Sequence, residues 1–313
     1  MKNQIDLEFS RLMDFIKPYD VTQMKDAVLK NLRYFSNTDK LNYNSTINYF
    51  NKYKLWGSFY PENDVYELAD NRAHALVEHR QDFEWLYDRL CDFHSKKILV
   101  NILSYWLSSD FNKIKQIHGN PFHQYFDLDI IKCDENEVFV DIGAYIGDTM
   151  VDYVKIFREG CYKRIYCYEI MPANIECIRK NIELFNLKDV VVKAKGASDK
   201  SGFLFLSDDA VSSIGTLSES GTIKVPTVAI DDDINEPVTF IKMDIEGAEE
   251  QALLGLRKKI LESHPKLALS VYHNHKDIWK LARIIDEIDP SYNFYLRYYG
   301  SALLPTEYLL YGV

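Results

Sequence analysis

The chain has 313 residues, a length that predicts two domains. Hydrophobic residues make up 47% and charged residues 27%, so an extended disordered protein is not expected. Acidic residues exceed basic ones by 47 to 37 and no dense lysine and arginine stripe occurs, which argues against nucleic acid as a partner. No apolar run approaches the ~18 residues of a membrane span, and the first residues lack a signal-peptide pattern, which predicts a cytoplasmic protein without membrane insertion.

The first part of the chain has the periodicity of amphipathic helices. Apolar residues recur at spacings of three and four, as in Phe83, Leu86, Leu90 and Phe93. We therefore predict an all-α region over residues 1–127. For its many aromatic residues there are three alternatives: they pack in the core, form the interface of a homodimer or line a sugar-binding cleft.

The second part, residues 128–313, alternates short apolar runs with helical patterns. Strands are predicted at 137–141, 164–168, 190–197, 238–243 and 267–272, and helices at 148–158, 172–185, 248–263 and 276–288. This alternation indicates an α/β domain with a parallel sheet covered on both faces. Two more strands, 293–299 and 307–313, follow one another without a helix and predict a closing antiparallel hairpin. Residues 203–230 form an insertion with short strand-like pieces.

A glycine turn follows the first predicted strand of this domain. Gly143 and Gly147 allow a tight turn at the carboxyl end of the sheet, where such folds bind ligands. A dinucleotide motif needs a glycine where Tyr145 stands, and Asp141 and Asp148 would repel a pyrophosphate. These carboxylates suit a ligand with an ammonium and a sulfonium, which is the chemistry of S-adenosylmethionine.

The second and third strand ends add residues suited to a nucleoside. Glu169 lies about 20 residues beyond the turn, the distance at which an acid accepts hydrogen bonds from ribose hydroxyls. Ile170 is placed to pack on an adenine face. Ala197 and Ser198 should bring backbone and small polar groups near the adenine edge.

Three segments resemble the FkbM family of S-adenosylmethionine-dependent methyltransferases: Val140-Asp141-Ile142-Gly143-Ala144-Tyr145-Ile146-Gly147-Asp148-Thr149, Tyr168-Glu169 with Pro172 and Asn174, and Ile241-Lys242-Met243-Asp244-Ile245-Glu246-Gly247-Ala248-Glu249. The resemblance covers roughly residues 136–313. It implies a Rossmann-like seven-stranded sheet whose last strand is antiparallel. It also implies methyl transfer to an oxygen, typically a hydroxyl of a sugar or a glycosylated small molecule.

The resemblance and the reasoning from the strand ends together give the expected cofactor contacts. These are Asp141, Gly143, Ala144, Tyr145, Gly147, Asp148, Thr149, Glu169, Ile170, Ala197, Ser198 and Asp244.

Catalysis would need a base for the acceptor hydroxyl, because a sugar hydroxyl is a poor nucleophile. We expect His273, after the fifth strand, to be that base, with Asp244 or Glu246 orienting it or holding the methionine end of the cofactor. The alternative is that His273 and Glu246 only cap helices. A further alternative is that Asp244, Glu246 and His273 form a Mg²⁺ site.

The insertion offers a further candidate, a lid over the acceptor. Its polar residues would bond sugar hydroxyls or would simply form a solvated loop: Asp208, Asp209, Ser212 and Ser213.

Two rival functions remain from the sequence. One is an NAD-dependent sugar oxidoreductase or epimerase on the same fold. The other is a degenerate methyltransferase domain that serves as an interaction module through its helical half. Tyr145 argues against the first, and Asp141, Glu169 and Asp244 argue against the second.

Overall fold

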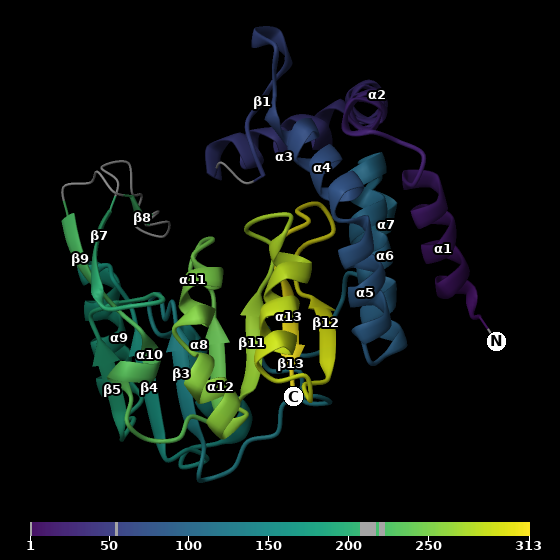
Figure 1. Cartoon of the computed structure of the whole chain (residues 1–313). Helices are drawn as coiled ribbons and strands as arrows, with labels where there is room; N and C mark the ends of the chain where they lie inside the picture. Colours follow the sequence, from purple (N-terminus) through teal and green to yellow (C-terminus); the bar gives the residue numbers. More distant parts are fainter. Residues whose placement is uncertain (1, 54–55, 207–216, 219–222) are drawn as a thin grey trace. The chain divides into compact units, whose positions relative to one another are not determined.

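The computed structural model describes residues 2–53, 56–206, 217–218 and 223–313. The chain forms two compact units (Figure 1). The helical unit comprises Met1–Pro121, Val271–Ala282 and Asn293–Leu310, and the α/β unit comprises Phe122–Ser270, Arg283–Tyr292 and Tyr311–Val313. No helix in the described ranges is long and apolar enough to cross a membrane.

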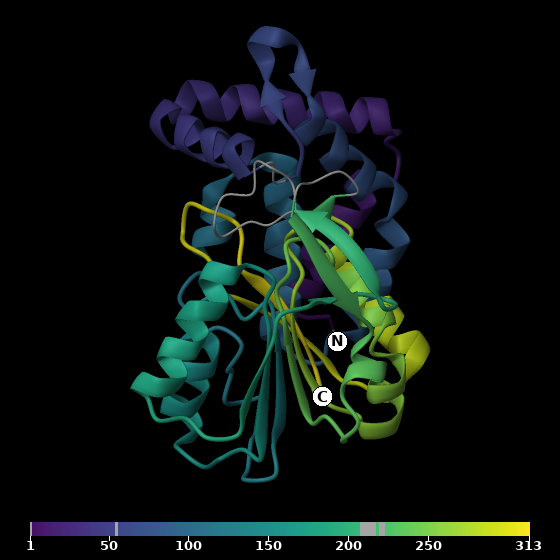
Figure 2. The ribbon, with the colours of Figure 1, turned by 90° about the vertical axis from the view of Figure 1, so that its left-hand side faces the viewer.

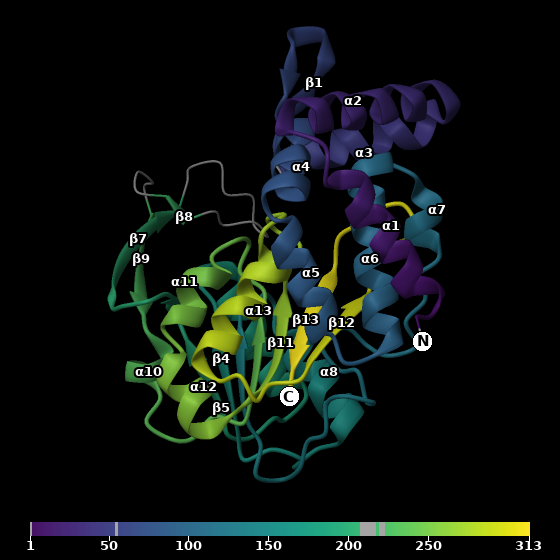
Figure 3. The ribbon, with the colours of Figure 1, turned by 45° about the vertical axis from the view of Figure 1, so that its right-hand side comes forward.

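The helical unit begins with these helices in its described residues: α1 (Gln4–Ile16), α2 (Val21–Thr38), α3 (Lys40–Tyr53), α4 (Glu67–Glu78), α5 (Arg80–Arg89), α6 (Phe93–Ser108) and α7 (Phe111–Lys115). Capping boxes start the first two, at Asn3 with Asp6 and at Asp20 with Gln23, so the leading backbone amides are satisfied locally. Helix α1 packs against α5 and α6, and α2 packs against α4 (Figure 3).

The prediction that residues 1–127 are all helical is wrong at one place. Strands β1 (Phe59–Tyr60) and β2 (Val65–Tyr66) form a small antiparallel hairpin around a 3₁₀ turn at Pro61–Asn63. Pro61 favours the start of this turn, and Asp64 takes a left-handed backbone conformation with φ of 57°. So short a hairpin carries no periodic apolar pattern to reveal it.

The predicted seven-stranded sheet is confirmed. Its strands are β3 (Val138–Ile142), β4 (Arg164–Tyr168), β5 (Val190–Lys193), β10 (Phe240–Met243), β11 (Lys266–Ser270), β12 (Phe294–Tyr298) and β13 (Tyr308–Gly312). Their order is β12-β13-β11-β10-β3-β4-β5, mostly parallel with one antiparallel end. Parallel pairing joins β11 to β10, β10 to β3, β3 to β4 and β4 to β5.

Helices cover both faces of this sheet in the α/β unit. They are α8 (Asp148–Phe157), α9 (Pro172–Leu184), α10 (Ile230–Asp233), α11 (Glu249–Leu254) and α12 (Arg257–Ser263), and α13 (Asp277–Ile288) follows β11. Figure 2 shows α8 and α9 on one side of the strands and α11 and α12 on the other. The central strands β3 and β10 are buried on both faces, which is why they read as nearly continuous apolar runs in the sequence.

Two predicted elements are each divided in the structure. The strand predicted at 190–197 is two strands, β5 and β6 (Gly196–Ala197), because the chain turns where the Lys195 amide donates to the Lys193 carbonyl at 2.9 Å. The helix predicted at 248–263 is broken into α11 and α12 at Gly255. A Cβ at Gly255 would lie 2.0 Å from the Ser198 carbonyl oxygen, so the backbones meet there.

The insertion contributes to a second sheet, of four strands in the order β6-β9-β7-β8. Its strands besides β6 are β7 (Gly202–Leu206), β8 (Leu217–Ser218) and β9 (Ile223–Val228). The strand-like pieces expected in the insertion are therefore real strands. The lid candidates Asp208, Asp209, Ser212 and Ser213 lie outside the described residues.

An aromatic cluster forms part of the core of the α/β unit. The rings of Phe139 and Phe240 stack on neighbouring strands with centroids 4.8 Å apart, and Tyr153 of α8 stacks on Phe139 at 5.1 Å. Phe126, 1% exposed, meets all three rings edge-on. The segment that precedes the first strand is thereby fixed to the α/β unit, and it brings Tyr125 with it.

Candidate active site

The glycine turn links β3 to α8 as the sequence predicts. Gly143 and Gly147 both adopt positive φ, 81° and 82°, and a Cβ at Gly143 would lie 1.8 Å from the carbonyl oxygen of Asp244. The backbone of the turn therefore approaches the end of β10 as only glycine allows. Tyr145 also has a positive φ, 46°, and is 42% exposed, so its ring stands out from the turn.

The other expected residues of the turn divide between surface and interior. Ala144 is fully buried and Thr149 is 9% exposed within the first turn of α8, whereas Asp148 is exposed. Asp148 is thus accessible to a cationic group of a ligand at this edge of the sheet.

Glu169 directly follows β4 and is 7% exposed. Its Oε1 accepts hydrogen bonds from the backbone amides of Ile170 and Met171, at 2.7 and 2.8 Å, which fixes the carboxylate. Its Oε2 has no hydrogen-bond partner within the described part of the chain. An oriented carboxylate oxygen is therefore available to accept from hydroxyl groups.

Residues expected near an adenine gather beside Glu169. A Cβ at Gly196 would lie 3.5 Å from Cγ2 of Ile170, so the start of β6 lies next to the segment that follows β4. Ala197 is buried, and the amide of Ser198 donates to the Val228 carbonyl within the smaller sheet. The structure thus brings Ile170, Gly196 and Ala197 together as an apolar strip next to the carboxylate.

A buried ion pair lies under the glycine turn. Lys242 and Asp141 occupy matched positions on the parallel strands β10 and β3, and their charged groups are 2.9 Å apart. Both are almost completely buried, and the Lys242 ammonium also donates to the Gly143 carbonyl at 2.6 Å. The ammonium therefore ties the start of the turn to β10.

The two members of this pair respond differently to burial. Burial raises the pKa of Asp141 to about 6; the Lys242 charge opposes this, and the charges of Asp148 and Glu169 add to it. For Lys242, burial acts to lower the pKa, but the charges of Asp141 and Asp244 outweigh it and the pKa is raised. Lys242 is therefore charged near neutrality, while Asp141 gains a proton below about pH 6.

Asp244, at the end of β10, is held by a residue that precedes the sheet. The phenol of Tyr125 donates to Oδ2 of Asp244 at 2.6 Å, and the Tyr125 ring lies 5.0 Å from the Lys242 ammonium. Tyr125 is 8% exposed and has a left-handed φ of 70°, an uncommon conformation for a residue with a side chain. A cation–π contact and a hydrogen bond thus connect the buried pair to Asp244.

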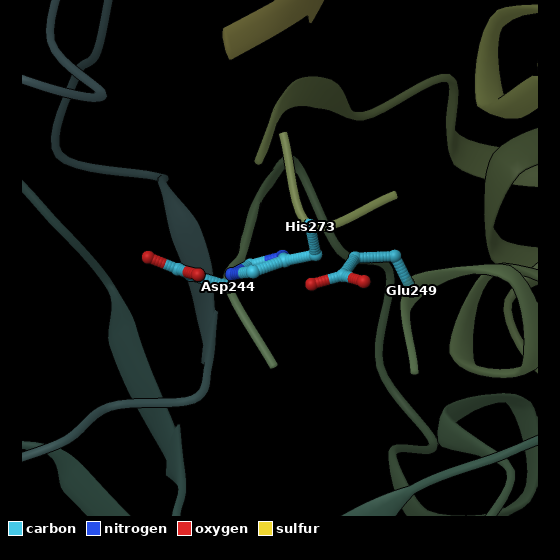
Figure 4. Close-up of side chains that lie close together, drawn as sticks. All are labelled: Asp244, Glu249 and His273. Atoms are coloured by element: carbon cyan, nitrogen blue, oxygen red, sulfur yellow. The ribbon is translucent and has the colours of Figure 1, made fainter. Parts of the chain in front are cut away.

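Two glutamates follow Asp244 and differ in their surroundings. Glu246, the expected catalytic partner, is exposed, with a left-handed φ of 56° at the turn before α11. Glu249 is 1% exposed, and its Oε1 accepts from the Ile245 amide at 2.9 Å. The turn is therefore held by Glu249, whose side chain is drawn with that of Asp244 in Figure 4.

His273, the expected base, is part of the helical unit and stands three residues beyond β11 (Figure 4). It is 7% exposed, and its ring lies 4.2 Å from that of Tyr272. It lines a pocket of the helical unit together with Trp56, His275 and Lys276.

Three residues of this site were not anticipated from the sequence: Tyr125, Lys242 and Glu249. Lys242 carried a signal, because a lysine between Ile241 and Met243 interrupts a strand that is otherwise apolar. Glu249 stands in the quoted motif but was not distinguished from Glu246. Tyr125 lies outside every motif, so only the fold could place it.

A seven-stranded sheet of this order, with a glycine turn after its first strand in the chain, defines a Rossmann-like methyltransferase fold. The Methyltransferase FkbM domain model matches residues 141–298, half of the chain. The chain belongs to the FkbM methyltransferase family, so the expected membership is confirmed. No curated protein matches the sequence.

Among solved structures, the chain is similar to the methyltransferase FkbM from Methylobacillus flagellatus KT, with 26% identity and a TM-score of 0.68. That similarity covers 78% of this chain and 61% of the other, so this chain spans less than two thirds of that protein.

Two other structures match over smaller parts. They are an rRNA methylase from Streptococcus thermophilus (13% identity, TM-score 0.40, covering 57% of this chain and 87% of that one) and a SAM-dependent methyltransferase from Aquifex aeolicus (15%, 0.36, covering 65% and 96%).

Proposed function

We propose that this chain is an S-adenosylmethionine-dependent O-methyltransferase whose acceptor is a hydroxyl of a sugar or a glycosylated small molecule. Membership of the FkbM family supports methyl transfer. The observation that carries a nucleoside cofactor is the fixed carboxylate of Glu169, with one oxygen held by two amides and the other available for ribose hydroxyls.

The residues around the glycine turn fit such a cofactor. Glu169 would accept from the ribose hydroxyls, and Ile170 and Ala197 would line the adenine. The exposed carboxylate of Asp148 would face a cationic group and would repel a pyrophosphate, which disfavours NAD. When bound, the cofactor would supply an electrophilic sulfonium methyl carbon that a nucleophilic oxygen can attack, with the thioether as the leaving group.

The chain's own part in the reaction would be to position the acceptor and remove its proton. In this proposal a ring nitrogen of His273 takes the hydroxyl proton as the C–O bond forms and the C–S bond breaks. Asp244, at the end of the strand next to β11, would orient the acceptor or the base. Holding the reacting atoms in line contributes up to ~7–11 kcal/mol, and the base ~10²–10⁴-fold in rate.

Isothermal titration calorimetry with S-adenosylhomocysteine and with NAD tests the cofactor assignment. The proposal predicts binding of S-adenosylhomocysteine and not of NAD. Glu169→Gln should weaken that binding about tenfold or more, because a hydrogen bond to a charged group contributes ~1.5–3 kcal/mol. Glu183→Gln, on the exposed side of α9, is the matched control and should change nothing. Binding of NAD alone would overturn the proposal.

A further inference from the structure

A pocket of about 340 Å³ lies within the helical unit. This volume falls in the range of ligand pockets, ~300–1,000 Å³. Its wall includes the expected base, His273, together with residues of α4 and of the segment that follows β11. None of these residues belongs to the glycine turn, and all of them lie in the helical unit.

The floor of the pocket is rigidly built. The indole nitrogen of Trp56 donates to the Tyr272 carbonyl at 2.5 Å, and the Trp56 carbonyl accepts from the side-chain amide of Asn71 at 2.9 Å. Gly57 follows with a φ of 99°, and a Cβ there would lie 2.7 Å from that same amide. These contacts fix Trp56 in place against the chain that carries His273.

The ionisable side chains among the described lining of the pocket are basic. The described residues around it include four histidines and one lysine but no carboxylate, although the whole chain has a formal net charge of −10. Carboxylates pair with two of the histidines, Glu78 with His74 at 3.0 Å and Asp82 with His79 at 3.2 Å. Both pairs are partly exposed, so solvent screens them.

Arg72, near the Trp56 side of the pocket, is a buried cation without a counter-ion among the described residues. Arg72 is completely buried, and it forms no ion pair with any described residue. One of its terminal nitrogens donates to Ser109 at 3.2 Å, while its Nε and other terminal nitrogen have no partner in the described ranges. The guanidinium carbon lies 6.0 Å from the ring of Trp56, which lines the pocket.

His275 connects this cation to the pocket. Its ring lines the pocket and lies 5.2 Å from Trp56 and 4.6 Å from Trp106. It is 7% exposed, and its Nε2 has no hydrogen-bond partner among the described residues. Burial and then the Arg72 charge hold the pKa of His275 well below its usual range, so the ring is neutral and can donate one hydrogen bond.

We infer that this pocket binds an anionic group, a phosphate or a carboxylate carried by the methyl acceptor. A buried charge is costly when unpaired, and a bound anion would offset the charge of Arg72 through a wall of low dielectric constant. Lys276, exposed at the pocket, places an ammonium group in its lining that can contact an anion directly. The inference rests on the proposed function and narrows its acceptor to anionic saccharides.

Calorimetry at constant ionic strength tests this inference with three probes: glucose 6-phosphate, glucuronate and glucose. We expect at least one anionic probe to bind about tenfold more tightly than glucose. Tighter binding of glucose 6-phosphate would identify a phosphorylated acceptor, and tighter binding of glucuronate a carboxylated one. Equal binding of all three probes, or no binding of either anion, would overturn the inference.

Substitutions of residues that line the pocket test whether the anion binds there. Lys276→Met should weaken the preferred anion about tenfold, and His79→Gln provides a second variant if the first does not fold. Lys280→Met, in α13 but outside the pocket lining, is the matched control and should have no effect. Equal losses in Lys276→Met and Lys280→Met would place the anion elsewhere and contradict the inference.

The same samples separate this inference from the proposed function. If S-adenosylhomocysteine binds but neither anion does, only the inference fails. If an anion binds with the expected sensitivity to Lys276→Met but S-adenosylhomocysteine does not bind, the proposed function fails and the anion pocket stands.

Discussion

The phenol of Tyr125 donates a hydrogen bond to Oδ2 of Asp244 over 2.6 Å, joining residues 119 positions apart in the chain. The same ring covers the ammonium of Lys242, which is paired with Asp141. Tyr125 is therefore a positioning residue for the carboxylate that ends β10.

Replacement of Tyr125 by phenylalanine should slow methyl transfer by about ten- to a hundredfold. A hydrogen bond to a charged group contributes ~1.5–3 kcal/mol, and each ~1.4 kcal/mol is tenfold in rate. The Kd of S-adenosylhomocysteine should change far less than the rate, because the hydrogen bond of Tyr125 goes to Asp244 whereas the proposed ribose carboxylate is Glu169. Single-turnover rates and calorimetry on the same samples check both values.

Tyr162→Phe is the control for this variant, because its phenol bonds the Lys188 carbonyl at the surface. A Tyr125→Phe enzyme as fast as this control would show that Asp244 needs no support from Tyr125.

Replacement of Lys242 by methionine should lower the free energy of unfolding by about 3–5 kcal/mol. The change leaves the carboxylate of Asp141 buried without its counter-ion. Urea unfolding measures the loss, and adding Asp141→Asn to the variant should restore part of it. Lys155→Met removes a surface pair with Asp152 and should stay within ~0.5 kcal/mol of wild type. Equal losses in the two single variants would contradict a stabilising role for the buried pair.

The proton on Asp141 makes the stability of the unliganded protein depend on pH. The pKa of this carboxyl rises from 3.8 to about 6 on folding, so the folded state holds the proton more tightly than the unfolded chain. Its contribution to stability is therefore fully present below about pH 4 and is lost as the pH rises through about 6.

The difference in unfolding free energy between wild type and Asp141→Asn isolates this contribution. Urea unfolding between pH 4 and pH 7 should show wild type losing stability relative to the variant as the pH rises. A difference that does not change with pH, or one of the opposite sign, would mean that the folded protein does not hold this proton.

Replacement of Gly143 by alanine should abolish binding of S-adenosylhomocysteine and destabilise the fold. The new Cβ would lie 1.8 Å from the Asp244 carbonyl oxygen, so β3 and β10 must separate at the turn. Gly160→Ala is a matched control, because Gly160 has a similar φ of 78° and nothing within 4 Å of an added Cβ. The control should lose only about 1 kcal/mol, the ordinary cost of a left-handed alanine, and should bind normally. Equal effects of the two substitutions on calorimetric binding would show that backbone strain, rather than close approach, accounts for the glycine.

Sequence patterns predicted most of the α/β fold, because strands buried on both faces are continuous apolar runs between amphipathic helices. The patterns did not reveal the break at Gly255, since it depends on an approach to Ser198 that only the folded chain shows. The division of the chain at residues 127 and 128 stays a prediction.

The parts of the site that depend on residues close together in the sequence could be predicted, and the parts that depend on long-range contacts could not. The glycine turn and Glu169 lie at strand ends and were identified from spacing alone. The pair of Lys242 with Asp141 depends on the register of β10 against β3, and Tyr125 reaches Asp244 only through the docking of Phe126 on the sheet. Such long-range contacts leave no periodic signal in the sequence.

Methyl transfer from S-adenosylmethionine to a saccharide hydroxyl can be measured directly. The enzyme would be incubated with ¹³C-methyl S-adenosylmethionine and a panel of sugar nucleotides and surface polysaccharides, and the products read by ¹³C NMR. We expect a new O-methyl resonance on a saccharide, which is lost in His273→Ala while S-adenosylhomocysteine still binds. Transfer of the label to nitrogen or carbon, or no transfer to any saccharide, would contradict it.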